Sequence, residues 1–283
     1  MHEERPRHDV VKLPRFQRQL VDWLDLNTGH PFYMIFEVDV TSARRYVREI
    51  RSRTGRPLSL TAFISSCFAA AIAENRMLQA YKKGRRRIAV FEDVDLAIAV
   101  EHNLEGAKIP LPAIVRRADQ MSPLEIDDAI REARAGQADQ AWALRWLGPW
   151  LLLPSFLRRF ILRRLLANPI RRKRLTGTAM VSASGMFAHG AGWGISPPSY
   201  TVSLLTGSLA KKPYVVNESL QTREILGITM CFDHDIVDGA VATRFAQRFK
   251  EMIEDCRQLR AAVEAPPSDS EMTKASAAKT AIA

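Results

Sequence analysis

The chain has 283 residues, of which 47% are hydrophobic and 25% are charged, and its formal net charge is +10. This is a globular composition that can bury a substantial core, in one large domain or two smaller ones. Its three cysteines, Cys67, Cys231 and Cys256, lie in apolar runs without metal-type spacing, and the polar amino terminus lacks the apolar stretch of a signal peptide. We therefore expect a reduced, cytoplasmic protein that binds no metal.

The first half of the chain alternates helical and strand patterns. Apolar residues at helical spacing predict helices at 16–26, 43–53, 60–73 and 123–134, the third Ala-rich and buried and the fourth exposed. Thr41 or Ser42 is positioned to cap the second helix, and Ser59 or Thr61 lies near the start of the third. Branched and aromatic runs predict strands at 31–40, 87–91, 95–100 and 108–115.

The second half resumes the strand pattern and closes with a helix. Strands are predicted at 178–182, 200–209 and 225–232, and a helix at 240–256. Beyond about residue 260 the sequence is rich in Ala, Ser, Pro and Lys, which predicts disorder. We therefore divide the chain into an amino-terminal arm at 1–30, a domain at 31–258 and a disordered tail at 259–283.

The positive charge is concentrated in one region. Between Gln140 and Asn217 there are no acidic residues, while lysine and arginine contribute eleven positive charges. Within 137–175, a predicted helix at 155–166 alternates apolar residues with arginines, which indicates one apolar side and one arginine side. The longest uncharged run in the segment 137–175 is about a dozen residues, whereas a membrane-spanning helix needs roughly 20. This segment is not expected to cross a membrane.

A histidine lies in a short turn between the last predicted strand and the last predicted helix. The sequence here is Asp-His-Asp-Ile-Val-Asp-Gly at 233–239. The strand fixes the backbone before His234, and Gly239 is expected to permit a tight turn. An imidazole titrates near neutral pH, as a general base for a thiol or hydroxyl requires. The alternative is an ordinary turn in which Asp238 caps the helix and His234 has no chemical role.

Five segments carry recognisable patterns in a fixed order. They are Phe-Glu-Val-Asp-Val-Thr at 36–41, Val-Asp-Leu-Ala-Ile-Ala-Val at 94–100, Ile-Val-Arg-Arg-Ala-Asp at 114–119, Gly-Thr-Ala-Met-Val-Ser at 177–182 with Gly-Met-Phe at 185–187, and the histidine turn at 233–239. With these segments, the chain from 31 to about 259 resembles the catalytic domain of 2-oxoacid dehydrogenase dihydrolipoamide acyltransferases, relatives of chloramphenicol acetyltransferase.

The resemblance implies a fold, an assembly and a role for each matching residue. The fold would be a two-layer α/β sandwich of the chloramphenicol acetyltransferase-like type, with a mostly antiparallel mixed sheet covered by helices, in a homotrimer. His234 would be the general base that takes a proton from a thiol. The resulting thiolate would attack a thioester carbonyl, which passes an acyl group between coenzyme A and a second acceptor. Ser182 of a neighbouring subunit would stabilise the oxyanion. Asp238 would hold the turn through an ion pair with Arg15, or with Arg18 in reserve. Without the resemblance, the favoured interpretation of Ser182 is a strand serine whose hydroxyl is bonded to backbone.

Four departures from the family pattern point to a stand-alone trimer. Asp235 occupies the place of the arginine that usually follows the histidine, and the segment 137–175 is longer than usual. The lipoyl and subunit-binding domains of the family have no counterpart before residue 31, and the tail lacks an apolar anchor. A lipoyl group, if used, would therefore come from a separate protein.

Two questions stay open from the sequence. The segment 137–175 is a helical elaboration packed on protein, an interfacial helix drawn to an anionic membrane surface, or a docking surface for an acidic ligand such as coenzyme A phosphates. Nucleic acid is not expected, because no recognised module is present. The protein as a whole is either an acyltransferase or a non-catalytic trimeric scaffold that binds a partner.

Overall fold

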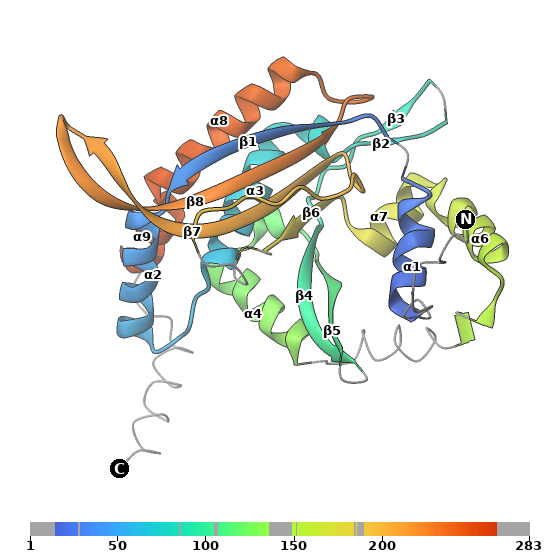
Figure 1. Ribbon diagram of the computed structural model, residues 1–283, viewed down its shortest axis with the longest axis horizontal. Coiled ribbons are helices and arrows are strands. Elements are labelled where there is room, and N and C mark those ends of the chain that lie inside the picture. The colour runs from blue at the N-terminus through green and yellow to red at the C-terminus, as the bar shows by residue number, and fades with distance from the viewer. Residues whose placement is uncertain are drawn as a thin grey trace, which may run out of the picture.

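A six-stranded mixed sheet forms the centre of the molecule (Figure 1). The computed structural model describes residues 15–27, 29–84, 86–104, 107–135, 149–150, 152–183, 185 and 190–264. The strand order is β1-β8-β7-β6-β4-β5. The strands are β1 (Pro31–Asp39), β4 (Leu96–Leu104), β5 (Ala107–Val115), β6 (Ala179–Ser182), β7 (Val202–Val216) and β8 (Ser219–Asp233). A separate two-stranded hairpin pairs β2 (Tyr81–Lys82) with β3 (Ile88–Ala89).

Antiparallel pairs predominate in the main sheet. β1–β8, β8–β7 and β4–β5 are antiparallel, whereas β6 runs parallel to both β7 and β4. The short strand β6 thus joins two antiparallel units. The predicted mixed, mostly antiparallel sheet is confirmed.

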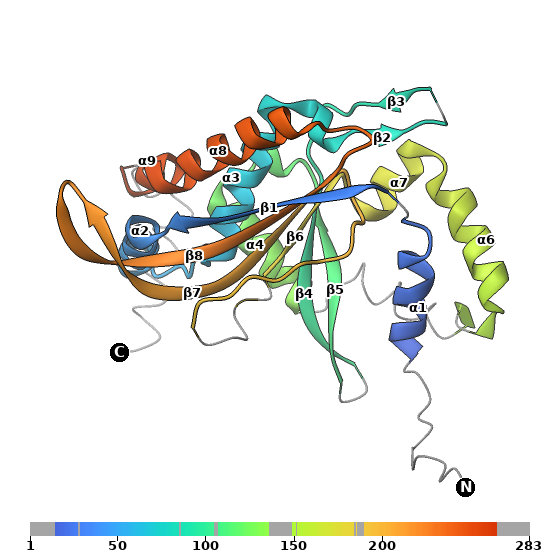
Figure 2. The ribbon, with the colours of Figure 1, turned by 45° about the horizontal axis from the view of Figure 1, so that its top comes forward.

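Helices form the second layer. These are α2 (Thr41–Thr54), α3 (Leu60–Glu74), α4 (Pro123–Arg134), α8 (Gly239–Asp255) and α9 (Arg257–Glu264), with the 3₁₀ turns Arg76–Gln79 and Ala118–Gln120. Figure 2 shows α2, α3, α8 and α9 above one face of the sheet. The helix-side core is continuous, because buried residues of these helices and of the strands belong to one cluster. This confirms the expected two-layer arrangement.

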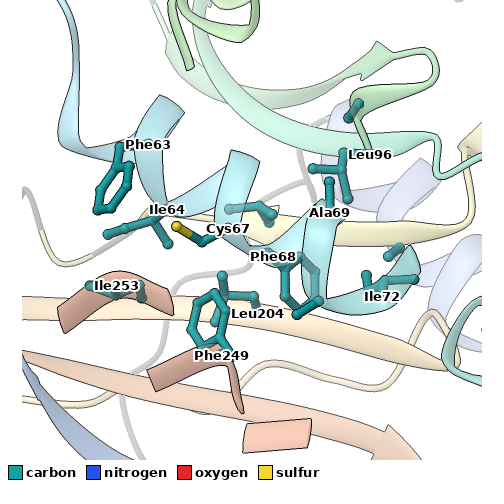
Figure 3. Packing of buried hydrophobic residues seen from close by; sticks show 14 of the residues in the cluster. Phe63, Ile64, Cys67, Phe68, Ala69, Ile72, Leu96, Leu204, Phe249 and Ile253 are labelled. Atoms are coloured by element: carbon teal, nitrogen blue, oxygen red, sulfur yellow. The ribbon is translucent and has the colours of Figure 1, made fainter. Parts of the chain in front are cut away.

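Helix α3 lies at the centre of that core. Ten of its residues are buried, as its uncharged Ala- and Phe-rich sequence predicts, and the Ser59 side chain caps it by accepting from the Ala62 N–H. The ring of Phe68 meets that of Phe249 edge-on at 5.8 Å (Figure 3) and that of Phe245 at 5.9 Å. Burial raises the pKa of the Cys231 and Cys256 thiols to about 11 and that of Cys67 further. All three cysteines are free and buried, as predicted.

Several expectations about individual elements are wrong. Helix α2 begins at Thr41 without a side-chain cap, because Asp39 accepts from the Thr41 N–H while the Thr41 hydroxyl accepts from the Glu224 N–H on β8. Helix α4 is partly buried, since Ile126 and Ile130 pack into the core. The strand predicted at 87–91 shrinks to two residues outside the main sheet.

The carboxyl-terminal boundary also differs from the expectation. Helix α9 runs to Glu264, so the first part of the tail predicted at 259–283 is helical. Leu259 is fully buried in the core, and α9 packs against α2. Burial of the Leu259 side chain stabilises the helix beyond residue 258. Residues 265–283 lie outside the described part of the chain.

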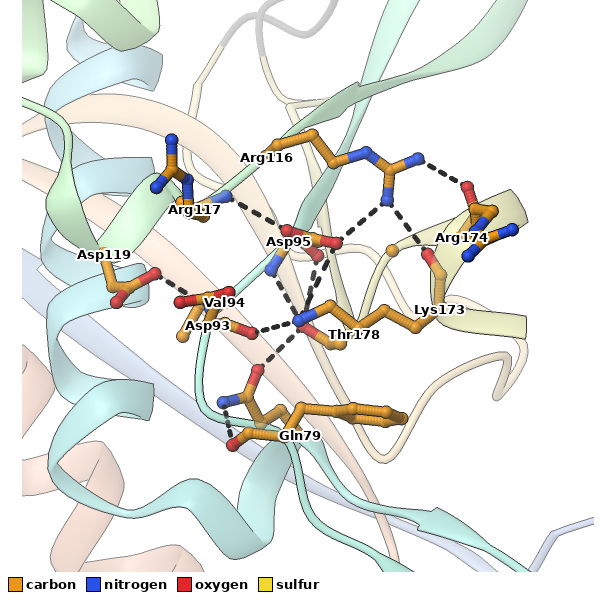
Figure 4. A network of polar contacts seen from close by, with 12 residues as sticks. Gln79, Asp93, Val94, Asp95, Arg116, Arg117, Asp119, Lys173, Arg174 and Thr178 are labelled. Carbon is orange, nitrogen blue, oxygen red and sulfur yellow. Dashed lines mark hydrogen bonds and ion pairs between the residues drawn. The ribbon is translucent and has the colours of Figure 1, made fainter. Parts of the chain in front are cut away.

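A buried carboxylate ties β6 to the rest of the sheet (Figure 4). Asp95, at the start of β4, accepts from Arg116 Nη1 at 2.9 Å and from the Arg117 N–H at 3.0 Å, and its backbone carbonyl accepts from the Thr178 N–H at 2.7 Å. Asp119 in turn accepts from the Val94 N–H at 2.8 Å. Three of the five recognised sequence segments therefore meet at this network, which fixes the strand that ends in Ser182.

A smaller helical unit lies beside the sheet. It consists of α1 (Arg15–Leu24), α6 (Ser155–Leu166) and α7 (Pro169–Thr176), and Figures 1 and 2 place it at the end opposite α2. Asp22 and Arg158, whose side chains are 5% and 3% exposed, form an ion pair at 2.6 Å that joins α1 to α6. No helix in the described part of the chain is long and apolar enough to cross a membrane.

The predicted apolar and arginine sides of α6 are wrong. The side facing α1 contains the buried Arg158, whereas Phe156 and Phe160 are 69% and 55% exposed on the outer side. The periodicity does not show which side is inside, and both sides carry apolar residues and arginines, since Arg163 and Arg164 are exposed beside the two phenylalanines. The choice depends on Asp22, which lies 136 residues away in the sequence and neutralises the arginine.

Replacing Asp22 by alanine is expected to destabilise the small helical unit by about 3–5 kcal/mol, because it leaves the buried Arg158 guanidinium without its carboxylate. Asp25→Ala is the matched control, since its pair with Arg159 joins the same helices at 2.9 Å through side chains that are 45% and 43% exposed. Its effect should stay below about 1 kcal/mol. Hydrogen exchange of α1 and α6 measures both, and equal effects would refute the role of the buried pair.

Candidate active site

His234 lies in the turn that follows β8. Its N–H donates to the His30 carbonyl at 2.8 Å, and its ring lies 5.0 Å from that of Phe32. The Ile236 and Val237 N–H groups close the turn onto the Asp233 carbonyl at 3.1 and 3.0 Å. The imidazole is exposed. The backbone of His234 is thus held on both sides while its ring remains accessible.

Gly239 was expected to permit a tight turn, but its backbone conformation does not require glycine. Its φ lies outside the left-handed region, and an added Cβ would meet no described atom within 4 Å. It is the first residue of α8. The turn is closed by the bonds to Asp233, so glycine is not required within the described chain.

Asp235 joins two basic side chains beside His234. Its carboxylate lies 2.8 Å from His30 Nδ1 and pairs with the Lys82 ammonium, which is also 3.8 Å from Asp233. The sequence patterns did not single out His30 or Lys82 as neighbours of this turn. Pro31 pairs with Asp233, and this pairing brings His30 to the turn of His234. The sequence could predict this neighbour only if the strand that pairs with β1 were already known.

Asp238 caps α8 through a side-chain bond from the Val241 N–H at 2.9 Å. The ion pair expected from Arg15 stays a prediction, because the Arg15 side chain lies outside the described residues. Arg18, the reserve partner, is exposed, and no ion pair to Asp238 occurs among the described side chains. The capping role is therefore the one that the described contacts define.

Ser182 is the last residue of β6. Its backbone pairs with Leu205 of β7, and no described residue hydrogen-bonds its hydroxyl. It lines a cavity of about 570 Å³ between β4, α4 and the start of α3. The same cavity is lined by Arg131 and Arg134 of α4, and Arg134 is exposed. Sequence reasoning did not single out these arginines, because they have the ordinary spacing of a helix surface.

Ser182 and His234 do not meet within one chain. The sheet register aligns Ser182 with Leu205 and then with Thr229, five residues before His234. At about 3.3 Å per residue and 4.8 Å between strands, their backbones lie roughly 15–20 Å apart. No single thiol and carbonyl could touch both side chains. A site that uses both residues must therefore be completed by a second chain.

No group of three or more potential metal-ligating side chains was found among the residues described here. The titratable side chains around the turn of His234 include Asp233, Asp235, Lys82 and His30. An accessible imidazole next to charged side chains can carry out acid–base chemistry.

Comparison with known proteins gives the family. The model of the 2-oxoacid dehydrogenases acyltransferase (catalytic domain) matches residues 6–143 and 162–261. The chain therefore belongs to this family, and the resemblance inferred from the five sequence segments is confirmed. Residues 144–161, which include the first half of α6, interrupt the match.

Curated relatives are components of large complexes. The chain is 25% identical over 260 residues to a probable dihydrolipoyllysine-residue succinyltransferase component of the 2-oxoglutarate dehydrogenase complex of Schizosaccharomyces pombe, covering 87% of this chain and 50% of the relative. The corresponding Saccharomyces cerevisiae protein is 22% identical over 268 residues, covering 90% and 50%. The chain thus spans about half the length of these relatives.

Solved structures share the fold. A probable dihydrolipoamide acetyltransferase of Listeria monocytogenes superposes with a TM-score of 0.64 at 20% identity, covering 88% of this chain and 95% of the other. The dihydrolipoamide acetyltransferase of Azotobacter vinelandii gives 0.66 at 15% identity, covering 89% and 94%. At these identities, the likeness establishes the architecture alone.

Proposed function

We propose that this protein transfers an acyl group between coenzyme A and a thiol acceptor of the dihydrolipoamide type. His234 removes the proton from the attacking thiol, and the thiolate adds to the thioester carbonyl. The tetrahedral oxyanion accepts a hydrogen bond from Ser182. When the intermediate collapses, the carbon–sulfur bond of the original thioester breaks and the departing thiolate takes the proton back from His234. A thiol is acidic enough for a histidine to activate without a Ser-His-Asp triad.

The observation that carries this proposal is the placement of two accessible groups at strand ends within a chain of this family. His234 has an exposed ring on a backbone fixed by β1 and β8, and the Ser182 hydroxyl lines an open cavity. Relatives of this family are named for acyl transfer to a dihydrolipoyllysine residue. We assign the same class of reaction here because both side chains are retained.

The cavity at Ser182 supports a thioester site. Its volume of about 570 Å³ lies within the range of roughly 300–1,000 Å³ found for small-molecule pockets. Its lining combines apolar residues such as Ile98 and Pro57 with charged residues of both signs, which are Glu101, Asp127, Arg131 and Arg134. We assign the acyl-carrying arm of coenzyme A to this cavity, with a phosphate near Arg134, because guanidinium groups pair with phosphate oxygens.

We further propose that the active unit is a homotrimer whose sites lie between subunits. The separation of roughly 15–20 Å along the sheet calls for His234 of one subunit and Ser182 of its neighbour. A solved structure with the same fold is the cubic core of a pyruvate dehydrogenase multienzyme complex. The acceptor is then a lipoyl group or another small thiol.

A non-catalytic scaffold is the second candidate. It is favoured by Asp235, which takes the place of the family's arginine and forms ion pairs with His30 and Lys82. In this alternative the trimer would remain and the chemistry would be lost. The two candidates differ in one measurable property, which is turnover of an acyl-coenzyme A.

Release of coenzyme A from a panel of acyl-coenzyme A compounds, with dihydrolipoamide as acceptor, tests the proposal. Acyl transfer to the acceptor should appear for at least one compound and depend on His234. The three buried cysteines, with pKa values raised by burial, should react slowly with the thiol reagent used for detection. No transfer above the rate without enzyme for any compound would favour the scaffold.

A further inference from the structure

The outer side of α6 presents aromatic and basic residues together. Phe156, Phe160, Arg163 and Arg164 recur at intervals that place them on one side of the helix, and all four are exposed. Leu152, just before α6, is 85% exposed. The Arg164 guanidinium lies 5.5 Å from the centre of the Phe160 ring. A cluster of exposed aromatic rings on one face of a helix indicates a binding surface.

This orientation of α6 is enforced by the protein. Arg158 points to the opposite side, where it donates to Asp22 at 2.6 Å and to the Leu153 carbonyl at 2.8 Å. Trp150 Nε1 donates to Gln19 of α1 at 2.6 Å. A rotation that buried the two phenylalanines would remove the Arg158 guanidinium from its carboxylate. The side with Phe156 and Phe160 therefore stays outside because Arg158, on the opposite side, is paired with Asp22.

The outer face is also positive. Asp22 and Asp25 of α1 are the acidic residues that contact α6, and they pair with Arg158 and Arg159. Arg163 and Arg164 have no carboxylate partner among the described residues. The chain from 141 to 216 contains no acidic residue that could neutralise them from nearby sequence. A ligand of this face must tolerate aromatic side chains and bring negative charge.

We propose that the outer face of α6, formed by Leu152, Phe156, Phe160, Arg163 and Arg164, binds an anionic lipid surface. Phenylalanine and leucine insert among the acyl chains near the headgroups, while arginine reaches lipid phosphates through its long side chain. Leu152, Phe156 and Phe160 of this face lie in the segment 144–161 that interrupts the family match, whereas Arg163 and Arg164 lie within the matched residues. The proposal does not depend on acyltransferase activity.

A second copy of the chain is a poorer occupant of this face. Two α6 faces brought together about a two-fold axis would place Arg163 and Arg164 against the same residues of the partner, and like charges in contact oppose association. An anionic bilayer instead supplies negative charge over its whole surface and accepts the aromatic rings. Charge complementarity therefore favours lipid.

Co-sedimentation of the full chain with vesicles tests the proposal. Vesicles of phosphatidylcholine alone are compared with an equimolar mixture of phosphatidylcholine and phosphatidylglycerol, at low and at physiological salt. We expect binding to the anionic vesicles that weakens with salt. Arg163→Gln with Arg164→Gln should lower the affinity roughly 30-fold, since each basic residue near such a surface contributes about 1 kcal/mol. Phe156→Ala with Phe160→Ala should lower it at least about tenfold.

Matched controls lie at the other end of the molecule. Arg48→Gln with Arg51→Gln on α2 removes the same charge from another exposed helix, and Val215→Ala with Leu220→Ala removes exposed apolar side chains from the β7–β8 hairpin. Both should bind as the unaltered chain does. Absence of binding to anionic vesicles would overturn the proposal, and so would an equal loss in the α2 control. Self-association that depends on Phe156 and Phe160 without lipid binding would overturn it in favour of a second copy.

Discussion

Replacing His234 by alanine is expected to lower kcat/KM for acyl transfer by about 10²–10⁴-fold, because the attacking thiol loses its general base. The fold should be unaffected, since the imidazole is exposed and the bond that holds the turn is made by the His234 backbone N–H. Steady-state rates at several acyl-coenzyme A concentrations measure the effect, with the thermal unfolding temperature as the check on folding.

His30→Ala is the matched control. It removes a neighbouring imidazole but keeps the main-chain carbonyl that accepts from His234. The His30 side chain contacts Asp235 and is 81% exposed, so its loss should change the rate by less than about tenfold. If His30→Ala abolished transfer while His234→Ala did not, the base would be the other imidazole and the assignment would be wrong.

Replacing Ser182 by alanine is expected to lower kcat by about 10²–10³-fold, because a preorganised donor to the oxyanion is removed. KM should change much less, since the hydroxyl acts mainly in the transition state. Ser203→Ala on the adjacent strand β7 is the control, because its hydroxyl is buried and has no partner, so its removal breaks no described bond. Equal losses in both variants would point to disturbed packing of the sheet instead of oxyanion stabilisation.

The sequence predicted the main strands and helices well where residues close together in the sequence determine the structure. The run at 60–73 has no charge, so burial on all sides follows, and α3 is the helix at the centre of the core. The strand alternation before His234 likewise predicted β8, and with it the placement of the histidine at a strand end. These features depend on neighbours in sequence, which periodicity reports directly.

Features that depend on distant partners were missed. Helix α6 does not separate an apolar side from an arginine side as predicted, because Asp22 holds Arg158 inside, and Asp235 meets His30 across 205 residues of sequence. The cap of α2 was also misassigned, because the Thr41 hydroxyl accepts from Glu224 on β8. In each case a partner that is distant in the sequence decided the contact.

The family segments explain how much of the site was predictable. Asp95, Arg116 and Thr178 come from three of those segments and meet in the network that fixes β6. Their patterns are therefore structural requirements that place Ser182. They say nothing about a residue on another chain, so the pairing of Ser182 with His234 lies beyond what one sequence or one protomer contains.

Complementation between two inactive variants tests that pairing most directly. His234→Ala and Ser182→Ala chains would be co-expressed with different tags, and assemblies carrying both tags would be purified. If each site takes histidine from one subunit and serine from its neighbour, a trimer that carries both variants should regain about a third of its sites, because one of its three interfaces joins an intact His234 to an intact Ser182. Mixed assemblies as inactive as either parent would contradict a shared site between subunits.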